Sequence, residues 1–245
     1  MKRRIFVTSA KGQVGFNAIL RNEKYLKKRR KIMTKLIEKH THKEEILHSL
    51  THGIAGMLSV IGLILLVMKT ASLGKTKLIG SIIFGVSLIL LYSASAIYHA
   101  SPYETRSREV LQKLDHCMIY VLILGTYVPA CLTALGGWLG WAVFAIVATC
   151  CITGVIINLI DIGRFYKLSI VLYVVSGWMI AVVAVPFIKT IGWQGFTFLL
   201  LGGLFYTAGL IFYRMTKTRY MHFVWHVFVM LGSLMHFVMV YLYVY

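Results

Sequence analysis

Charge is the feature this sequence most lacks. Only 14% of its 245 residues are charged and 58% are apolar, whereas soluble domains carry about 25% charged residues. The few charges are also unbalanced, because 26 Lys and Arg face 8 Asp and Glu, for a formal charge of +18. Residues 1–48 hold fourteen of the basic residues and four of the acids, while the other 197 residues hold twelve and four. The chain is therefore a charged leader followed by a nearly uncharged body.

This distribution excludes a secreted disulfide scaffold, a disordered chain, a nucleic-acid-binding domain and an ordinary soluble enzyme, and it leaves a polytopic membrane protein. Cysteine is scarce as well. The four cysteines form no C-x-x-C motif, so we expect them to pack as small apolar residues. The leader lacks the apolar core and cleavage site of a secretory signal peptide. The cysteines are Cys117, Cys131, Cys150 and Cys151.

Long uncharged apolar runs fill the body of the chain. A run of about 18 residues is needed to cross roughly 30 Å of hydrocarbon as a helix, and seven runs reach that length. They do not alternate as the strands of a membrane barrel would. The expected fold is an all-α membrane protein, a bundle of seven transmembrane helices. The runs are Ser49–Met68, Leu78–Tyr98, Cys117–Leu135, Trp138–Ile160, Leu168–Ile188, Trp193–Tyr213 and Phe223–Tyr245.

The basic residues between the runs predict the orientation. One set of connecting segments, including the leader, carries 22 Lys and Arg, and the other carries 4; without the leader the counts are 8 and 4. Basic residues favour the cytoplasmic side, which places the N-terminus inside and the C-terminus outside. We expect a basic cytoplasmic segment, 1–46, and a membrane domain, 47–245. The basic run at 27–31 is interpreted as fixing topology, and Met33 is an alternative start.

Ionisable residues at the membrane edge are costly unless they are paired or functional. His222 and His226 are spaced i, i+4, so both imidazoles lie on one helix face within about 5–6 Å and could share a metal ion. His99 ends the second run, with Ser95 one turn earlier, and Asp115 lies two residues before the third run. The predicted topology places all five at the cytoplasmic side of the membrane.

Simpler roles stay open for several of these residues. Asp115 could be a helix N-cap, and Ser95 could hydrogen-bond its own i−4 carbonyl. His116 is expected to be interfacial. His236 lies about 15 Å deeper than His226 by helical rise, so it is expected to make an interhelical hydrogen bond. Six further residues could supply partners to metal ligands but show no spacing for a single ion: His40, His42, Glu44, Glu45, His48 and His52.

Several sequence blocks together resemble the hemolysin III family of bacterial membrane proteins. That family is related to the adiponectin and progestin receptors and, more distantly, to the alkaline ceramidases. The resemblance covers residues 44–245. The blocks are Glu44-Glu45 with Thr51-His52-Gly53, Ser95-Ala-Ile-Tyr-His99, Leu114-Asp115-His116 with Gly125-Thr126-Tyr127, Gly202-Gly203-Leu-Phe-Tyr206, His222-Phe-Val-Trp225-His226 and Gly232-Ser233-Leu-Met-His236-Phe237.

The resemblance implies a zinc (Zn2+) site on the cytoplasmic side of the bundle. Asp115 would contact a zinc-bound water, and Ser95 would lie beside it. This chain departs from the pattern at His48, where relatives often have Asn. The ligands carried over are His99, His222 and His226.

Three histidine ligands leave zinc an open position, as in catalytic sites. The leading hypothesis is a zinc-dependent hydrolase of a membrane lipid, with an amide bond suggested only by the similarity to ceramidases. Asp115 would be the general base and Ser95 an oxyanion donor. The alternatives are a membrane regulator or lipid sensor with structural zinc, and a hemolysin-type cytolysin. Membrane lipids are the expected partners and nucleic acid is not; a homo-oligomer stays open. The expected location is the bacterial plasma membrane, spanned several times.

Overall fold

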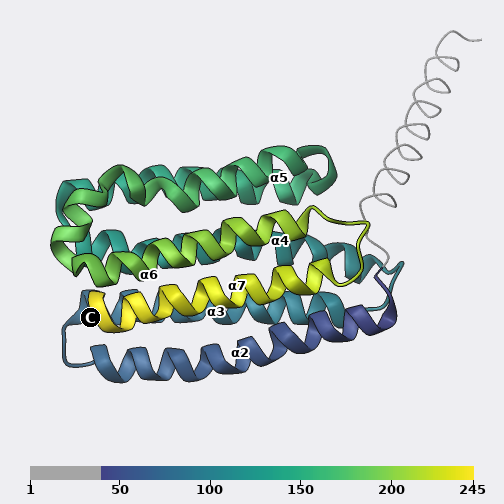
Figure 1. The fold of residues 1–245 in the computed structure, drawn as a ribbon, viewed down its shortest axis with the longest axis horizontal. Helices are drawn as coiled ribbons and strands as arrows, with labels where there is room; N and C mark the ends of the chain where they lie inside the picture. The colour runs from purple at the N-terminus through teal and green to yellow at the C-terminus, as the bar shows by residue number, and fades with distance from the viewer. Residues whose placement is uncertain (1–39) are drawn as a thin grey trace, which may run out of the picture. The chain divides into compact units, whose positions relative to one another are not determined.

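The structure, a computed structural model, describes residues 40–245, and the helices of this range lie side by side with their axes along one direction (Figure 1). The basic run at 27–31 and the alternative start Met33 lie outside the described residues. Chain connectivity places the turn at 71–74 and the loop at 214–220 at opposite ends of the helices (Figure 1). The elements are α2 (His42–Thr70), α3 (Lys75–Ala100), α4 (Arg106–Tyr127), η1 (Val128–Leu135), α5 (Gly137–Trp178), η2 (Met179–Val183), α6 (Ala184–Tyr213), α7 (Met221–Met239) and η3 (Val240–Val244).

Helix α2 begins before the apolar run that predicted it. The Oγ1 of Thr41 accepts the Glu44 N–H at 3.3 Å, and the Glu44 carboxylate accepts the Thr41 N–H at 2.8 Å. This reciprocal capping box satisfies two backbone donors that a helix start leaves unpaired. The predicted start at Ser49 was therefore wrong by seven residues, because the first two turns are polar. His48 is consequently a helical residue whose side chain faces the neighbouring helices.

Helix α4 also begins early. The Oγ1 of Thr105 accepts the Arg108 N–H at 3.2 Å and caps the helix. The apolar run predicted a start at Cys117. Asp115 therefore lies well inside α4, and the prediction that it could be an N-cap was wrong. Its carboxyl group is available for contacts with other helices.

Residues 137–213 form a continuous helical stretch instead of three separate runs, but the backbone leaves the helical conformation twice. At Asp161, φ is −162° and ψ is 101°, and the Asp161 carboxylate accepts the Arg164 N–H at 3.1 Å, so it caps the part that follows. At Gly192, φ is +73°, a conformation that glycine adopts without steric cost. Both breaks fall between runs that the sequence predicted.

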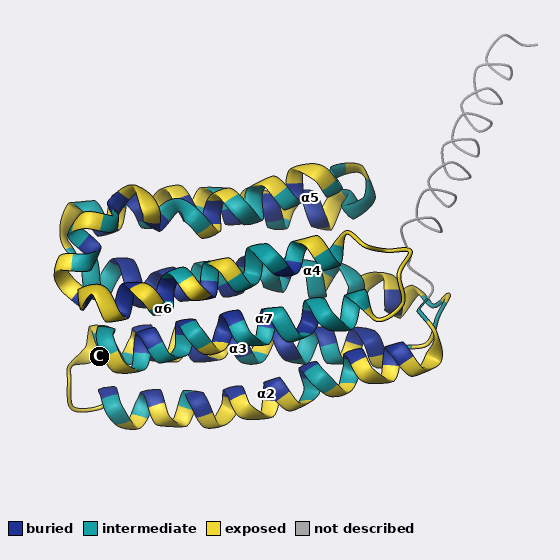
Figure 2. Cartoon of the chain, viewed as in Figure 1, coloured by how far each residue is buried: buried dark blue, intermediate teal, exposed yellow. Residues whose placement is uncertain are grey.

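Each helix buries one face and exposes another. Helix α2 packs against α3 and α7, α3 against α4, α4 against α5, and α6 against α7. Figure 2 shows the buried residues turned towards neighbouring helices and the exposed ones turned outward. The outward faces are rich in large apolar side chains, such as Met57 on α2 and Trp138 on α5. An exposed apolar surface of this extent is typical of a membrane protein.

Within the described residues, five helical segments are long and apolar enough to cross a membrane. Four correspond to single predicted spans, and the fifth is the long stretch with two breaks. The segments are His42–Thr70, Lys75–Ala100, Arg106–Leu135, Gly137–Tyr213 and Met221–Val244.

Candidate metal centre

Three histidines from two helices converge at one end of the bundle. His99 lies in the last turn of α3, and His222 and His226 lie in the first two turns of α7. One ring nitrogen from each lies within 4.8 Å of the other two. Two nitrogens on one tetrahedral zinc are about 3.4 Å apart, since each Zn–N bond is about 2.0–2.1 Å. Small ring movements would therefore let all three bind one ion.

Glu44 connects the first turns of α2 and α7. Besides capping α2, its carboxylate accepts the backbone N–H of Tyr220 at 2.8 Å, just before α7 begins. A carboxylate is favourable at a helix start because it accepts hydrogen bonds from unpaired N–H groups and its charge is attracted to the positive end of the helix dipole. One acid thus stabilises two helix starts, and it fixes the position of His222 relative to α2.

Glu45 orients the third histidine. Its carboxylate contacts His99 Nδ1 at 2.8 Å and accepts hydrogen bonds from Arg108, at 2.5 Å, and from the Tyr103 hydroxyl. Burial, together with the hydrogen bond to Glu45, raises the pKa of the Tyr103 phenol, so it stays a donor at neutral pH. A carboxylate on one ring nitrogen fixes the tautomer and directs the other nitrogen towards a metal. Glu45, one of the six residues that could supply partners to metal ligands, thus contacts His99 in the structure.

Unsatisfied nitrogens test whether a metal fits here. His99 Nε2 is buried and has no hydrogen-bond partner, although Nδ1 of the same ring is held by Glu45. Buried polar atoms normally have partners, and a bound ion is one explanation when they do not. Neutral imidazole nitrogen is the donor type that zinc and similar ions prefer. The donor set therefore fits a transition metal.

Three more histidines surround this set. The sequence did not predict that the six would form one cluster. His48 lies 4.8 Å from His99 and 5.2 Å from His226 between ring centroids. His52 stacks on His226 with centroids 3.6 Å apart and rings 7° from parallel. His40 is 4.7 Å from His48. The i, i+4 spacing of His48 and His52 could have predicted that both lie on one helix face. That prediction requires α2 to start before Ser49, which the apolar run does not indicate.

Ser95 and Asp115 meet each other across α3 and α4. The Ser95 side chain lies within hydrogen-bonding reach of the Asp115 carboxyl group. The alternative of a bond from Ser95 to its own i−4 carbonyl stays open. Among the described residues, Asp115 belongs to none of the groups whose possible ligand atoms lie within 4.8 Å of one another. The structure therefore does not group Asp115 with the histidines as a possible ligand.

Three histidines lie outside this cluster: His42, which is exposed, His116 and His236. His236 Nε2 contacts the Leu199 carbonyl of α6 at 3.2 Å, which confirms the predicted interhelical hydrogen bond. His116 Nδ1 lies 2.8 Å from the Gln112 carbonyl of its own helix, and Nε2 lies 3.3 Å from the Tyr213 hydroxyl of α6. That His116 is interfacial stays a prediction.

A mostly apolar cavity lies inside the bundle. It is bounded by Leu91, one turn from Ser95, by Ile119, one turn from Asp115, and by Trp225, next to His226. Its lining also includes Tyr206 and His236. The cavity is therefore apolar apart from a few side chains, and the clustered histidines are not part of its lining.

A family model described as "Haemolysin-III related" matches residues 40–237. The chain belongs to the hemolysin III family. The match includes all six clustered histidines together with Glu45, Ser95 and Asp115. The resemblance seen in the sequence is thereby confirmed.

Two bacterial members of the hemolysin III family are similar over most of their length. "Hemolysin-3" of Bacillus cereus is 39% identical over 203 residues, covering 82% of this chain and 92% of the relative. "Hemolysin-3 homolog" of Bacillus subtilis (strain 168) is 38% identical over 194 residues, covering 79% and 91%. The human "Monocyte to macrophage differentiation factor" is 24% identical over 175 residues, covering 66% and 69%.

Proposed function

We propose that this hemolysin III family protein is an integral membrane, zinc-dependent hydrolase that cleaves a membrane lipid, with an amide bond as the preferred target. The observation that carries the proposal is the buried set of His99, His222 and His226, with Glu45 holding one ring. This arrangement leaves room for a fourth ligand on a tetrahedral ion, as catalytic zinc sites do. The choice of an amide rests only on the resemblance to alkaline ceramidases.

The apolar cavity supports a lipid as the substrate. Its walls begin one helical turn from Ser95 and Asp115 and consist largely of aliphatic and aromatic side chains. An acyl chain buried there would gain about 0.8 kcal/mol for each CH₂ removed from water. The polar end of the same lipid would then lie beside the histidines.

The chemistry follows from residue types and positions. A bound zinc ion would supply a Lewis acid that polarises a substrate carbonyl and favours deprotonation of water. Asp115 would accept a proton as general base and return it to the leaving group. In the structure the Ser95 side chain lies within hydrogen-bonding reach of the Asp115 carboxyl. Rotation of its hydroxyl towards the substrate would let it donate to the developing oxyanion.

The two breaks in the long helical stretch support seven crossings. Asp161 and Gly192 divide residues 137–213 into three parts, each of which can span about 30 Å at 1.5 Å per residue. With the other four segments this gives seven spans in a bacterial plasma membrane. The distribution of basic residues supports a cytoplasmic N-terminus and an extracellular C-terminus.

Asp115→Asn tests the catalytic proposal, because it keeps the shape of the side chain but removes the base. In lipid profiles of a deletion strain carrying this variant, we expect the changes seen in the empty deletion strain, with zinc still bound to the purified protein. Ser95→Ala should show a loss of about 100- to 1,000-fold or less, the usual cost of one oxyanion donor.

The matched control is His226→Ala, which should lose both zinc and the lipid effect. If Asp115→Asn restores the wild-type lipid profile fully while His226→Ala does not, the zinc is structural, and a lipid sensor becomes the better proposal. The packing of α2, α3 and α7 around the histidines favours that alternative. Lysis of the kind named in the bacterial relatives would be indirect, through altered lipids, because a chain this apolar cannot readily travel through water to a target membrane.

A further inference from the structure

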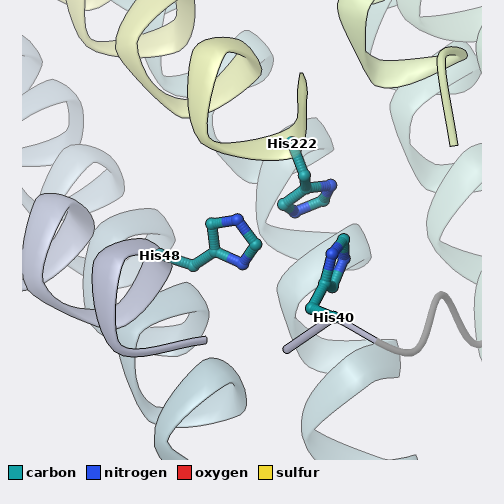
Figure 3. Close-up of side chains that lie close together, drawn as sticks. All are labelled: His40, His48 and His222. Carbon is teal, nitrogen blue, oxygen red and sulfur yellow. The ribbon is translucent and has the colours of Figure 1, made fainter. Parts of the chain in front are cut away.

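A second group of histidines lies beside the proposed zinc ligands. His40, His48 and His222 each offer a ring nitrogen within 4.8 Å of the other two, and Figure 3 shows the three rings turned towards a common space. Their ring centroids are separated by 4.7 Å, 4.8 Å and 5.0 Å. These spacings match those of the inner set, so the geometry is as suitable for a metal ion here as there.

His48 is the independent sign of a ligand. Its side chain is 0% exposed, and neither ring nitrogen has a hydrogen-bond partner. A buried imidazole without any partner is costly, since desolvation of each polar atom is left uncompensated. Binding to an ion would satisfy one nitrogen.

The two groups share a residue and differ in depth. His222 belongs both to the outer group and to the inner group with His99 and His226. His40 is half-buried, whereas His226 is 1% exposed. An ion held by the outer group could reach the inner one by keeping His222 and exchanging its other two ligands. The ring centroid of His48 lies 5.2 Å from that of His226 and 4.8 Å from that of His99, so this exchange needs no large movement.

We propose that His40, His48 and His222 form an outer site for a divalent transition metal, and that ions load into and leave the buried centre through it. The loading role rests on the proposed function of the inner centre; the outer site itself does not. Imidazole ligands select zinc, cobalt, nickel or copper over magnesium and calcium. A hydrated ion must lose water to reach a buried position, and successive histidines replace that water one ligand at a time.

The outer site is tested by cobalt(II) titration of the full-length protein in detergent, followed by visible absorption. His226→Ala removes a ligand of the inner centre, and this variant, purified without its zinc, should still bind added cobalt at the outer site, more weakly than the wild type binds it. Adding His40→Gln should weaken that binding by about tenfold or more, as loss of a metal partner typically does. Adding His42→Gln is the matched control, because His42 is exposed and belongs to neither group. It should leave the affinity unchanged.

The loading role is tested by kinetics with the inner centre intact. His40→Gln and His48→Asn should slow zinc uptake and zinc removal by a chelator about tenfold, while the final amount of zinc per chain stays at the wild-type level. His48→Asn keeps a polar side chain of similar reach, and thermal unfolding of each variant verifies the fold.

Three results would overturn the proposal. The outer site fails if His226→Ala binds no cobalt, or if His40→Gln weakens binding no more than His42→Gln does. The loading role fails if both kinetic variants exchange zinc at the wild-type rate. If His226→Ala leaves zinc binding unchanged but His40→Gln abolishes it, zinc binds at the outer site alone. That result would support the outer site and overturn the loading role. Since none of these measurements involves lipid, a failure of the hydrolase proposal alone would appear separately, as a zinc-loaded protein without lipid turnover.

Discussion

At the scale of single residues, two adjacent acids in the first turn of α2 have different tasks. Glu44 stabilises the starts of α2 and α7, and Glu45 binds His99, Arg108 and Tyr103. Neighbouring residues on a helix point about 100° apart, so one acid reaches α7 while the other reaches α3 and α4. The histidine cluster is therefore held from two sides by consecutive residues.

The ligand assignment predicts how zinc content responds to substitution. His222→Ala and His226→Ala should each lose most of the approximately one zinc per chain that we expect of the purified protein, because three ligands are needed to hold a catalytic ion. His236→Ala should keep its zinc, since that ring bonds the Leu199 carbonyl away from the site. Metal analysis of the three purified variants measures this. Equal losses from all three would refute the assignment.

At the scale of helices, close approach depends on small residues. In the structure Gly154 of α5 lies against Tyr120 of α4, and a Cβ built at Gly154 would lie 2.0 Å from the Tyr120 ring. That ring is fully buried and its hydroxyl is tied to Ser169. Contacts through glycine are a common means of packing membrane helices, because the backbones can come close.

Gly154→Ala should destabilise the packing of α5 on α4. The added methyl overlaps an aromatic ring that cannot move freely, and overpacking of this kind costs about 1–3 kcal/mol. Thermal unfolding in detergent should show a clearly lower Tm. Gly53→Ala is the matched control, since nothing lies within 4 Å of a Cβ at that helical position; it should leave the Tm unchanged or raise it slightly. Similar Tm losses in both variants would contradict the close approach.

At the scale of the whole molecule, the polar centre lies at one end of an apolar bundle. The histidines lie on α2, α3 and α7 near the same end of the bundle. The turn at 71–74 lies at the opposite end (Figure 1). If the basic residues set the orientation as usual, the histidines face the cytoplasm. Metal ions supplied by the cell would then reach the site directly.

Cysteine labelling of intact cells tests this orientation. Ser72→Cys should react with a membrane-impermeant maleimide, whereas Thr218→Cys should react only after permeabilisation. Both positions are exposed and lie in the connections at opposite ends of the bundle. The unsubstituted chain, with its own four cysteines largely buried, gives the background. Labelling of both variants in intact cells would show that the span count or the orientation is wrong.

Much of the site could be read from the sequence. The i, i+4 pair His222 and His226 lies on one helix face because helical geometry is local. The apolar runs located most helix bodies, since an apolar surface suits lipid wherever it occurs. The motif around His99 pointed to the same end of the bundle, and the structure brings the three rings together.

Tertiary structure decided the rest. Hydropathy does not predict the polar first turns of α2 and α4. Thr41 and Thr105 cap these turns. Contacts with other parts of the chain stabilise them further, through Glu44, Glu45 and Arg108. His48 gains its place among the other histidines only when α2 packs against α3 and α7. The sequence by itself determined a helical membrane protein and the pair His222 and His226, because those follow from hydrophobicity and helical periodicity. His99 joined that pair as a ligand only through the resemblance to the hemolysin III family. The six-histidine cluster depends on contacts between residues up to about 180 positions apart, which no local pattern encodes.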